Sequence, residues 1–169
     1  MNYKIKELNN KQIKIYDDLI NQGYRPIVAK ILALRDYSKA EKLIHYNLLS
    51  EIDIAVDYLF DAIKNKKKMC IVADYDVDGA TSCSIMYKGL EGLGADISYF
   101  VPNRFEHGYG LQESVINDML KSFPDTNVII TVDNGIASIA GVDYANSKNI
   151  DVVVTEHHIE GNDRPNAIC

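Results

Sequence analysis

The chain has 169 residues, of which 47% are apolar and 25% are charged, and its formal net charge is −6. This length suits one domain with a core of its own, and the acidic balance gives no support for nucleic-acid binding over a broad basic surface. The start of the chain lacks the apolar segment of a secretion signal, and no apolar run is long enough to span a bilayer. Three widely spaced cysteines fit reduced thiols. We therefore expect a cytoplasmic protein without a membrane segment.

Residues 1–66 are predicted to be a helical N-terminal lead-in. Apolar residues recur at helical spacing within 27–34 and again within 52–63. From residue 67 the pattern changes to alternating strands and helices, so we expect residues 67–169 to form a separate α/β domain.

Apolar, β-rich runs predict the strands of this domain, and three of them are short and do not alternate, as buried parallel strands require. The predicted strands are 69–73, 96–101, 128–132 and 151–155. The predicted helices are 81–93, 112–121 and one that starts near Ser138, a suitable N-cap. The first of these helices should carry four residues inward: Ile85, Met86, Leu90 and Leu93. Such alternation predicts an α/β fold with a parallel sheet and helices on both faces, and residues 165–169 resemble the start of a further strand.

Acidic and histidine residues follow three of the predicted strands. They are Asp74, Asp76, Asp78, Asp133, Glu156, His157 and His158. The carboxyl ends of parallel strands meet at one edge of an open α/β sheet, so these side chains should lie together. Carboxylates at such short separations repel one another and stay ionised only if a cation lies among them. The sequence therefore predicts a metal site, with room for two ions.

The donor atoms indicate which metal and which chemistry. Carboxylate oxygens with an imidazole suit Mn²⁺ or Mg²⁺ more than Zn²⁺, which prefers cysteine and more histidine. The pattern from Asp74 to Gly79 also resembles the front of a calcium-binding EF-hand loop, but Ile85 stands where that loop needs a glutamate. Two ions about 4 Å apart would hold a phosphate, activate water and stabilise the leaving oxygen. We therefore predict metal-dependent phosphoester hydrolysis.

Four segments of the chain are similar to the ordered motifs of a known family. They are 73–82, 101–111, 131–136 and 154–158. Together they resemble the DHH phosphoesterase superfamily, and most closely the RecJ-like, single-strand-specific 5′→3′ DNA exonucleases. The resemblance covers roughly residues 64–169 and implies that 67–169 form the N-terminal part of a DHH phosphoesterase domain, incomplete at its C-terminus.

The resemblance also implies which residues bind the metal ions. Asp74, Asp76 and Asp78 would be divided between two Mn²⁺ or Mg²⁺ ions. Asp133 would bridge the two ions, and His157 would bind the second.

Further residues are implied to contact the substrate. His158 would contact the scissile phosphate, so that it and Asp133 are the predicted catalytic residues. Arg104 and His107 would hold a phosphate or the 5′ end. The family's third motif begins with aspartate, whereas this chain has Glu156, and we expect that residue to orient a neighbour rather than to bind metal.

RecJ proteins continue through a further acidic ligand, the second half of the catalytic core and a nucleic-acid-binding module. This sequence shows none of these, so the expected partners are single-stranded DNA and either the missing C-terminal part or another replication or repair protein.

Two other functions remain open. One is a phosphodiesterase that acts on short oligonucleotides or cyclic dinucleotides. Residues 102–111 make this function less favoured, because they resemble RecJ. The other is a catalytically inactive scaffold of the same fold. The retained aspartates and both histidines favour the enzyme, whereas Glu156 and the missing C-terminal part favour the scaffold.

Overall fold

The computed structural model describes residues 6–37 and 45–169. The chain forms two compact units, one reaching to His45 and the other comprising Tyr46–Cys169. In the first unit, α1 (Asn10–Asn21) packs against α2 (Pro26–Leu34) around a small apolar core that includes Leu19 and Ala29. The units divide at residues 45 and 46, whereas the sequence prediction divides the chain at 66 and 67.

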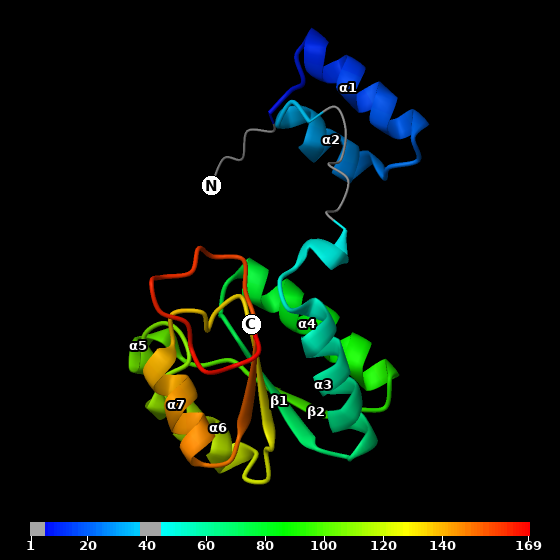
Figure 1. Cartoon of the computed structure of the whole chain (residues 1–169). Coiled ribbons are helices and arrows are strands. Elements are labelled where there is room, and N and C mark those ends of the chain that lie inside the picture. Colours follow the sequence, from blue (N-terminus) through cyan, green and yellow to red (C-terminus); the bar gives the residue numbers. More distant parts are fainter. Residues whose placement is uncertain (1–5, 38–44) are drawn as a thin grey trace. The chain divides into compact units, whose positions relative to one another are not determined.

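The second unit is built on a parallel four-stranded sheet of order β2-β1-β3-β4 (Figure 1). The strands are β1 (Lys68–Ala73), β2 (Asp96–Phe100), β3 (Val128–Val132) and β4 (Asp151–Thr155). The helical elements are η1 (Tyr46–Leu48), α3 (Ile52–Lys64), α4 (Val77–Gly92), α5 (Arg104–His107), α6 (Glu113–Ser122) and α7 (Ile139–Ser147). Each predicted strand is present to within one residue.

Helices cover both faces of the sheet, because successive strand residues point to opposite sides. Met69 and Ile71 of β1 join the core that includes residues of α3 and α4. Cys70 and Val72, one position along, join the core that includes residues of α6 and α7. The predicted α/β fold with helices on both faces is confirmed (Figure 1).

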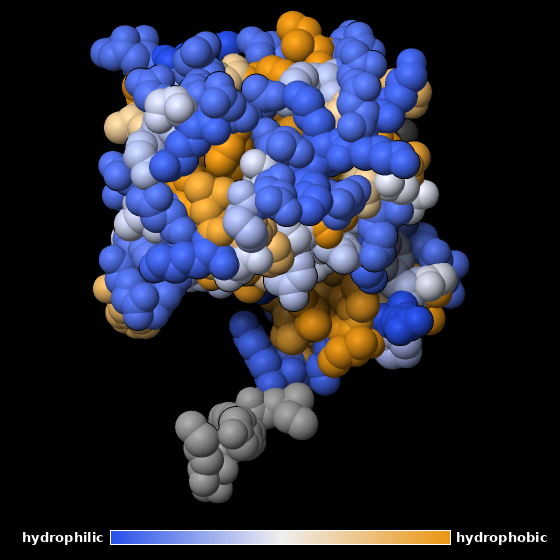
Figure 2. Space-filling view, turned by 90° about the horizontal axis from the view of Figure 1, so that it is seen from below, coloured by the Kyte–Doolittle hydropathy of each residue, from blue (hydrophilic) through white to orange (hydrophobic). Residues whose placement is uncertain are grey.

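The face shown in Figure 2 is mostly hydrophilic, with separate smaller hydrophobic areas. Among the described residues, none of the helices combines the length and the apolar character that crossing a bilayer requires.

The strand order places the loops after β1 and β3 side by side. The strand β1 pairs with β2 on one side and with β3 on the other, so the two strands that follow β1 in the chain lie on opposite sides of it. Ligands of open α/β sheets bind at such a switch point, outside the carboxyl ends of the strands. Asp74 follows β1 and Asp133 follows β3, so both lie at this point.

The prediction for the start of α4 was wrong by four residues, since the helix begins at Val77 and not at residue 81. Asp76 is the N-cap, and its carboxylate Oδ1 accepts a hydrogen bond from the Gly79 amide at 3.0 Å. Asp78 therefore lies in the first helical turn and not on extended backbone. Gly79 lies in the helix as well, where a Cβ would approach the Asp74 carbonyl oxygen to 2.2 Å. The glycine is needed for this close approach and not for a turn.

The predicted inward face of α4 was also partly wrong. Ile85 is 75% exposed and Leu93 is 71% exposed. The buried positions are Gly79, Cys83 and Leu90, whose spacing of four and seven residues keeps them on one side of a helix. Ile85 comes two residues after Cys83 and points away, and Leu93 is the C-cap.

Two details in the last part of the unit were predicted, whereas one earlier element was not. Ser138 is the N-cap residue of α7, but its hydroxyl accepts a hydrogen bond from the Leu111 amide at 2.9 Å instead of capping the helix. Ile168 forms a parallel bridge with Val153, as expected if residues 165–169 start a strand. The short helix α5 was not predicted.

Candidate metal centre

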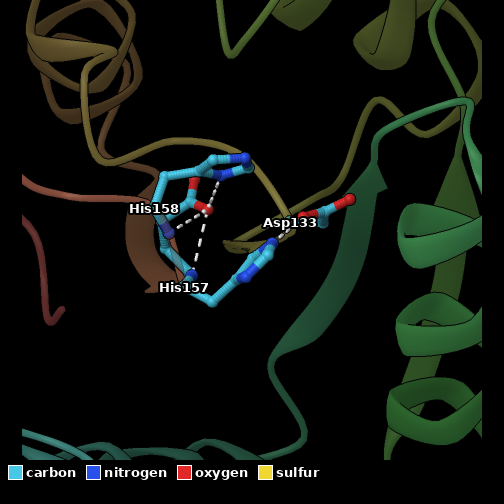
Figure 3. Close-up of side chains that lie close together, drawn as sticks. Asp133, His157 and His158 are labelled. Atoms are coloured by element: carbon cyan, nitrogen blue, oxygen red, sulfur yellow. Dashed lines mark hydrogen bonds and ion pairs between the residues drawn. The ribbon is translucent and has the colours of Figure 1, made fainter.

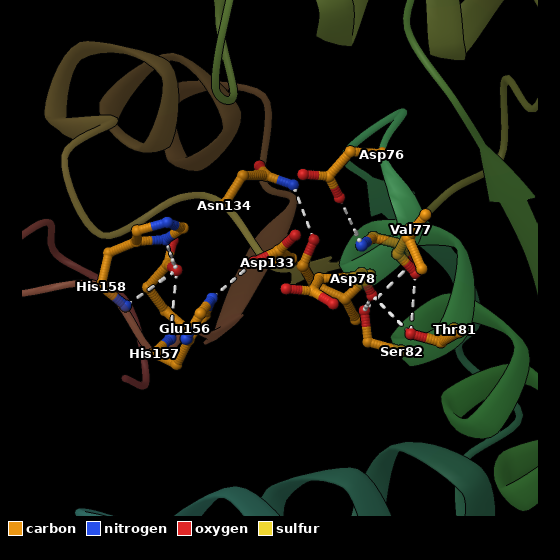
Figure 4. Close-up of polar contacts among 12 residues, drawn as sticks. Asp76, Val77, Asp78, Thr81, Ser82, Asp133, Asn134, Glu156, His157 and His158 are labelled. Atoms are coloured by element: carbon orange, nitrogen blue, oxygen red, sulfur yellow. Dashed lines mark hydrogen bonds and ion pairs between the residues drawn. The ribbon is translucent and has the colours of Figure 1, made fainter. Parts of the chain in front are cut away.

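Carboxylate and imidazole groups from the ends of three strands converge into two groups that share Asp133. One group contains Asp74, Asp76 and Asp133, and the other contains Asp133, Glu156, His157 and His158. Within each group, one ligand atom per residue lies within 4.8 Å of the others. Figure 4 shows Asp133 between the histidine pair on one side and Asp76 and Asp78 on the other.

The backbone of Asp133 is held in an unusual conformation. Its φ is 61°, in the left-handed region that costs a non-glycine residue roughly 1–2 kcal/mol. The amide of Asp133 donates to the Thr155 carbonyl oxygen at 3.1 Å, and its own carbonyl oxygen accepts from the Tyr109 hydroxyl at 3.3 Å. Such conformations persist where the surrounding contacts determine them. These contacts direct the buried carboxylate toward His157, whose Nε2 lies 3.0 Å from Asp133 Oδ1 (Figure 3).

The carboxylates of the first group repel one another. Burial, and after it the charge of Asp76, raises the pKa of Asp133. The hydrogen bond from the Gly79 amide lowers the pKa of Asp76 and so keeps that carboxylate charged. A cation between the two carboxylates would relieve their repulsion.

The side chain of Glu156 organises the histidine pair. It is only 6% exposed, and its Oε1 accepts hydrogen bonds from the amides of His157 at 3.1 Å and His158 at 3.2 Å. The same oxygen lies 2.5 Å from His158 Nδ1 (Figure 4). This hydrogen bond and the charge of Glu156 raise the pKa of His158. One carboxylate oxygen thus fixes both the backbone of the pair and the ring of His158.

These groups line a cavity of about 910 Å³. Its acidic wall contains Asp74, Asp76, Asp78 and Asp133, together with both histidines. The facing wall consists of residues 109–113 and of residues 135–141, which include the start of α7. The cavity is large enough for a nucleotide unit beside the metal ligands.

Not every predicted site residue joins the two groups. Asp78 lines the cavity but belongs to neither group. The guanidinium of Arg104 lies 4.4 Å from the centre of the Tyr75 ring, outside the cavity wall. The side chain of His107 is 8% exposed, and its Nε2 lies 3.1 Å from Asp118 Oδ2 on α6. The predicted roles of these three residues in binding metal or phosphate stay predictions.

Sequence reasoning gave no role to two residues that hold the centre in place. The hydroxyl of Tyr109 donates a hydrogen bond to the Asp133 carbonyl oxygen at 3.3 Å. Asn134 is buried, and its amide donates to main-chain oxygens of β1 and β3. Only its position directly after Asp133 could have drawn attention to it.

The donor set fits Mn²⁺ or Mg²⁺. Both groups offer carboxylate oxygens, with imidazole nitrogen in the second, and among the described residues no cysteine belongs to either. Hard divalent cations prefer such oxygen-rich sites, and adjacent carboxylates need a positive charge between them.

A parallel sheet with clustered aspartates and a histidine pair at its switch point defines an α/β domain with a candidate metal site. Residues 68–169 match the model of the DHH family, N-terminal domain, and the chain belongs to this family.

Several known proteins are similar to this chain. It is 41% identical over 150 residues to the single-stranded-DNA-specific exonuclease RecJ of Salmonella typhimurium, an alignment that covers 84% of this chain and 26% of that protein. It is 30% identical to RecJ of Bacillus subtilis over 98% of this chain and 22% of that protein. A crystal structure of exonuclease RecJ bound to manganese is 31% identical, with a TM-score of 0.66 over 76% of this chain and 32% of that one. The chain thus spans about a quarter of the length of the relatives that it matches.

Proposed function

We propose that this chain contributes ligands to both ions of a two-metal centre that hydrolyses phosphodiester bonds in single-stranded DNA, as part of a 5′→3′ exonuclease. The observation that carries the proposal is the membership of Asp133 in both ligand groups. The similar proteins are named single-stranded-DNA-specific exonucleases, and one similar structure is bound to manganese.

The ligand groups assign residues to two Mn²⁺ or Mg²⁺ ions. Asp74, Asp76 and Asp133 would hold one ion, and Asp133 and His157 would hold the other. Asp78 lines the same cavity and is kept as a proposed ligand. The bound ions would neutralise phosphate charge and increase the acidity of water.

The chain's own side chains would position the substrate. Glu156 orients the ring of His158 and raises its pKa, so that a larger share of this histidine carries a proton at neutral pH. We assign to His158 the donation of a hydrogen bond from Nε2 to an oxygen of the scissile phosphate. Arg104 and His107 remain proposed contacts for phosphate or the 5′ end, although His107 now pairs with Asp118.

We further propose that the protein acts in the cytoplasm. Because the chain spans about a quarter of the length of its relatives, the nucleic-acid grip would come from the counterpart of their remaining part or from another replication or repair protein.

The test is a calorimetric Mn²⁺ titration followed by incubation of the same sample with single-stranded DNA labelled at the 5′ or the 3′ end. Asp125→Ala is the control, because this exposed aspartate pairs with Lys68 at the opposite edge of the sheet. Two bound ions with loss of the 5′ label as mononucleotide support the proposal, and an equivalent duplex should resist.

Two outcomes would contradict it. Two bound ions with cleavage only of cyclic dinucleotides or short oligonucleotides would mean that these molecules, and not long single-stranded DNA, are the substrate. Absence of Mn²⁺ binding would leave a scaffold of the same fold.

A further inference from the structure

We propose that Asn134 is a positioning residue that sets the spacing of the metal-binding carboxylates by clamping the carboxyl ends of β1 and β3. The inference rests on the proposed metal centre and adds a residue that touches no ion in it.

The side-chain amide of Asn134 connects the two central strands. Its Nδ2 donates to the Val72 carbonyl oxygen of β1 at 3.1 Å and to the Val132 carbonyl oxygen of β3 at 2.9 Å. An amide nitrogen has two hydrogens, so one side chain uses its full donor capacity on one acceptor from each strand. The residue is 3% exposed, so water does not compete for these bonds. In Figure 4 the amide of Asn134 points to the side of Asp133 on which Asp76 lies.

The clamp lies where the pairing of the strands weakens. The last bond between them, from the Asp74 amide to the Val132 carbonyl oxygen, is 3.4 Å long, compared with about 2.9–3.0 Å for an ordinary bond of this type. Beyond this point the chain after β1 enters α4 and the chain after β3 turns away. Asp74 and Asp133 are the first residues past the clamped strands, so the separation of the strand ends sets the separation of these carboxylates.

A tight turn brings Asn134 back over the strands. Asp133 has a φ of 61° and Gly135 has a φ of 116°, and a Cβ at Gly135 would lie 2.4 Å from Thr131 Oγ1. Only glycine allows the chain to fold so closely onto β3. The sequence Asp133-Asn134-Gly135 thus turns one residue toward the cavity and the next toward the sheet.

Stability alone does not account for an amide at this position. The Oδ1 atom of Asn134 is buried and has no hydrogen-bond partner. Burying an unpaired acceptor is unfavourable, and an apolar side chain would avoid it. The two donated bonds are the property that an apolar residue could not supply.

The discriminating variant is Asn134→Asp, which keeps the size of the side chain and removes both donors. It also adds a negative charge beside the centre, and charge alone would tighten Mn²⁺ binding. Loss of the clamp should instead weaken Mn²⁺ binding. We expect an affinity about tenfold lower, as is found when other residues that support metal ligands are replaced. Asn134→Ala removes the donors without adding charge, should weaken binding similarly, and serves if the aspartate variant does not fold.

Asn127→Ala is the matched control. The Oδ1 of Asn127 accepts a bond from the Lys68 amide at 2.9 Å, so it joins the same two strands at the opposite end. This variant should lower the melting temperature and leave Mn²⁺ affinity within about twofold of the parent. Unchanged or tighter binding by both Asn134 variants, or equal weakening by Asn127→Ala, would overturn the inference.

Hydrogen exchange of the metal-free protein separates failure of the clamp from failure of the proposed function. If the parent bound no Mn²⁺, the proposed centre would fail, but the clamp would still predict faster exchange of the Asp74 and Asp133 amides in Asn134→Ala than in Asn127→Ala. Equal exchange of these two hydrogen-bonded amides would overturn the clamp by itself.

Discussion

At the switch point, individual side chains each make several contacts. Of the described residues, Asp133 alone belongs to both ligand groups, and its left-handed backbone is bonded to β4 through Thr155 and to the loop before α6 through Tyr109. Glu156 similarly serves two amides and one ring with a single oxygen. A substitution at either residue therefore disturbs several contacts at once.

Asp133→Ala should abolish the binding of both Mn²⁺ ions, because it removes the carboxylate that the two groups share. Asp76→Ala should remove one ion only, since Asp76 belongs to one group. Calorimetric stoichiometry distinguishes the two variants. One ion still bound to Asp133→Ala would contradict the bridging role.

Glu156→Gln should lower the pKa of His158 toward its ordinary value of 6.5, because the hydrogen bond and charge of Glu156 raise it. The raised pKa also makes stability depend on pH. The interaction of Glu156 with protonated His158 stabilises the folded state fully below the pKa that His158 has in the unfolded chain, and this stabilisation is lost as the pH rises through the higher pKa of the folded state. Proton NMR titration of the metal-free protein measures the shift. Glu160→Gln is the control, because that carboxylate bonds to Arg164, and an equal shift in this variant would exclude a specific role for Glu156.

At the scale of elements, α4 depends on two glycines in different ways. Gly79→Ala should destabilise the unit by at least about 2 kcal/mol and weaken Mn²⁺ binding, because its Cβ would meet the Asp74 carbonyl oxygen at 2.2 Å. Gly89 has nothing within 4 Å of a built Cβ, so Gly89→Ala should stabilise the same helix by about 0.5–1 kcal/mol. Urea unfolding measures both changes, and equal effects would show that space at Gly79 does not matter.

A second contact between elements joins α3 to the start of β4. The Tyr58 hydroxyl donates to Asp151, which also pairs with Lys67 at 2.8 Å. Burial and then Asp151 raise the pKa of Tyr58 from 10.0 to about 12. The neutral phenol is thus favoured by folding, so its contribution is complete below pH 10 and is lost as the pH rises toward 12.

Tyr58→Phe should cost about 1 kcal/mol at neutral pH, and this difference from the parent should shrink above pH 10. Denaturant unfolding at several pH values measures it. A difference that grew with pH would contradict the assigned hydrogen bond.

At the scale of the whole molecule, the sheet, its helices on both faces and the convergence of the acidic strand ends could be predicted from the sequence. Buried parallel strands are short apolar runs, and their carboxyl ends must meet at one edge. The start of α4 could not be predicted, because it is set by the Asp76 cap and places Gly79 inside the helix, although glycine is an unfavourable helix residue. The contacts of Asn134 and Tyr109 depend on tertiary structure, which no local pattern records.

Mn²⁺ should stabilise the second unit as a whole, because the ion binds the folded centre and not its separated segments. At a free concentration one hundred times its dissociation constant, one site adds about 2.7 kcal/mol. Thermal unfolding with Mn²⁺ and with a chelator measures the difference, for which Asp133→Ala is the control. An equal rise in the melting temperature of that variant would mean that the ion acts elsewhere.

The shared position of Asp133 also bears on how the protein folds. Its ligand groups draw on segments that follow β1, β3 and β4, so the site exists only after strands distant along the chain have paired. Contacts of high sequence separation form slowly, because loop closure precedes them. A metal ion that binds only the assembled strand ends should slow unfolding and leave the folding rate nearly unchanged. The ion would therefore lengthen the lifetime of the native state without acting as a nucleus for its formation.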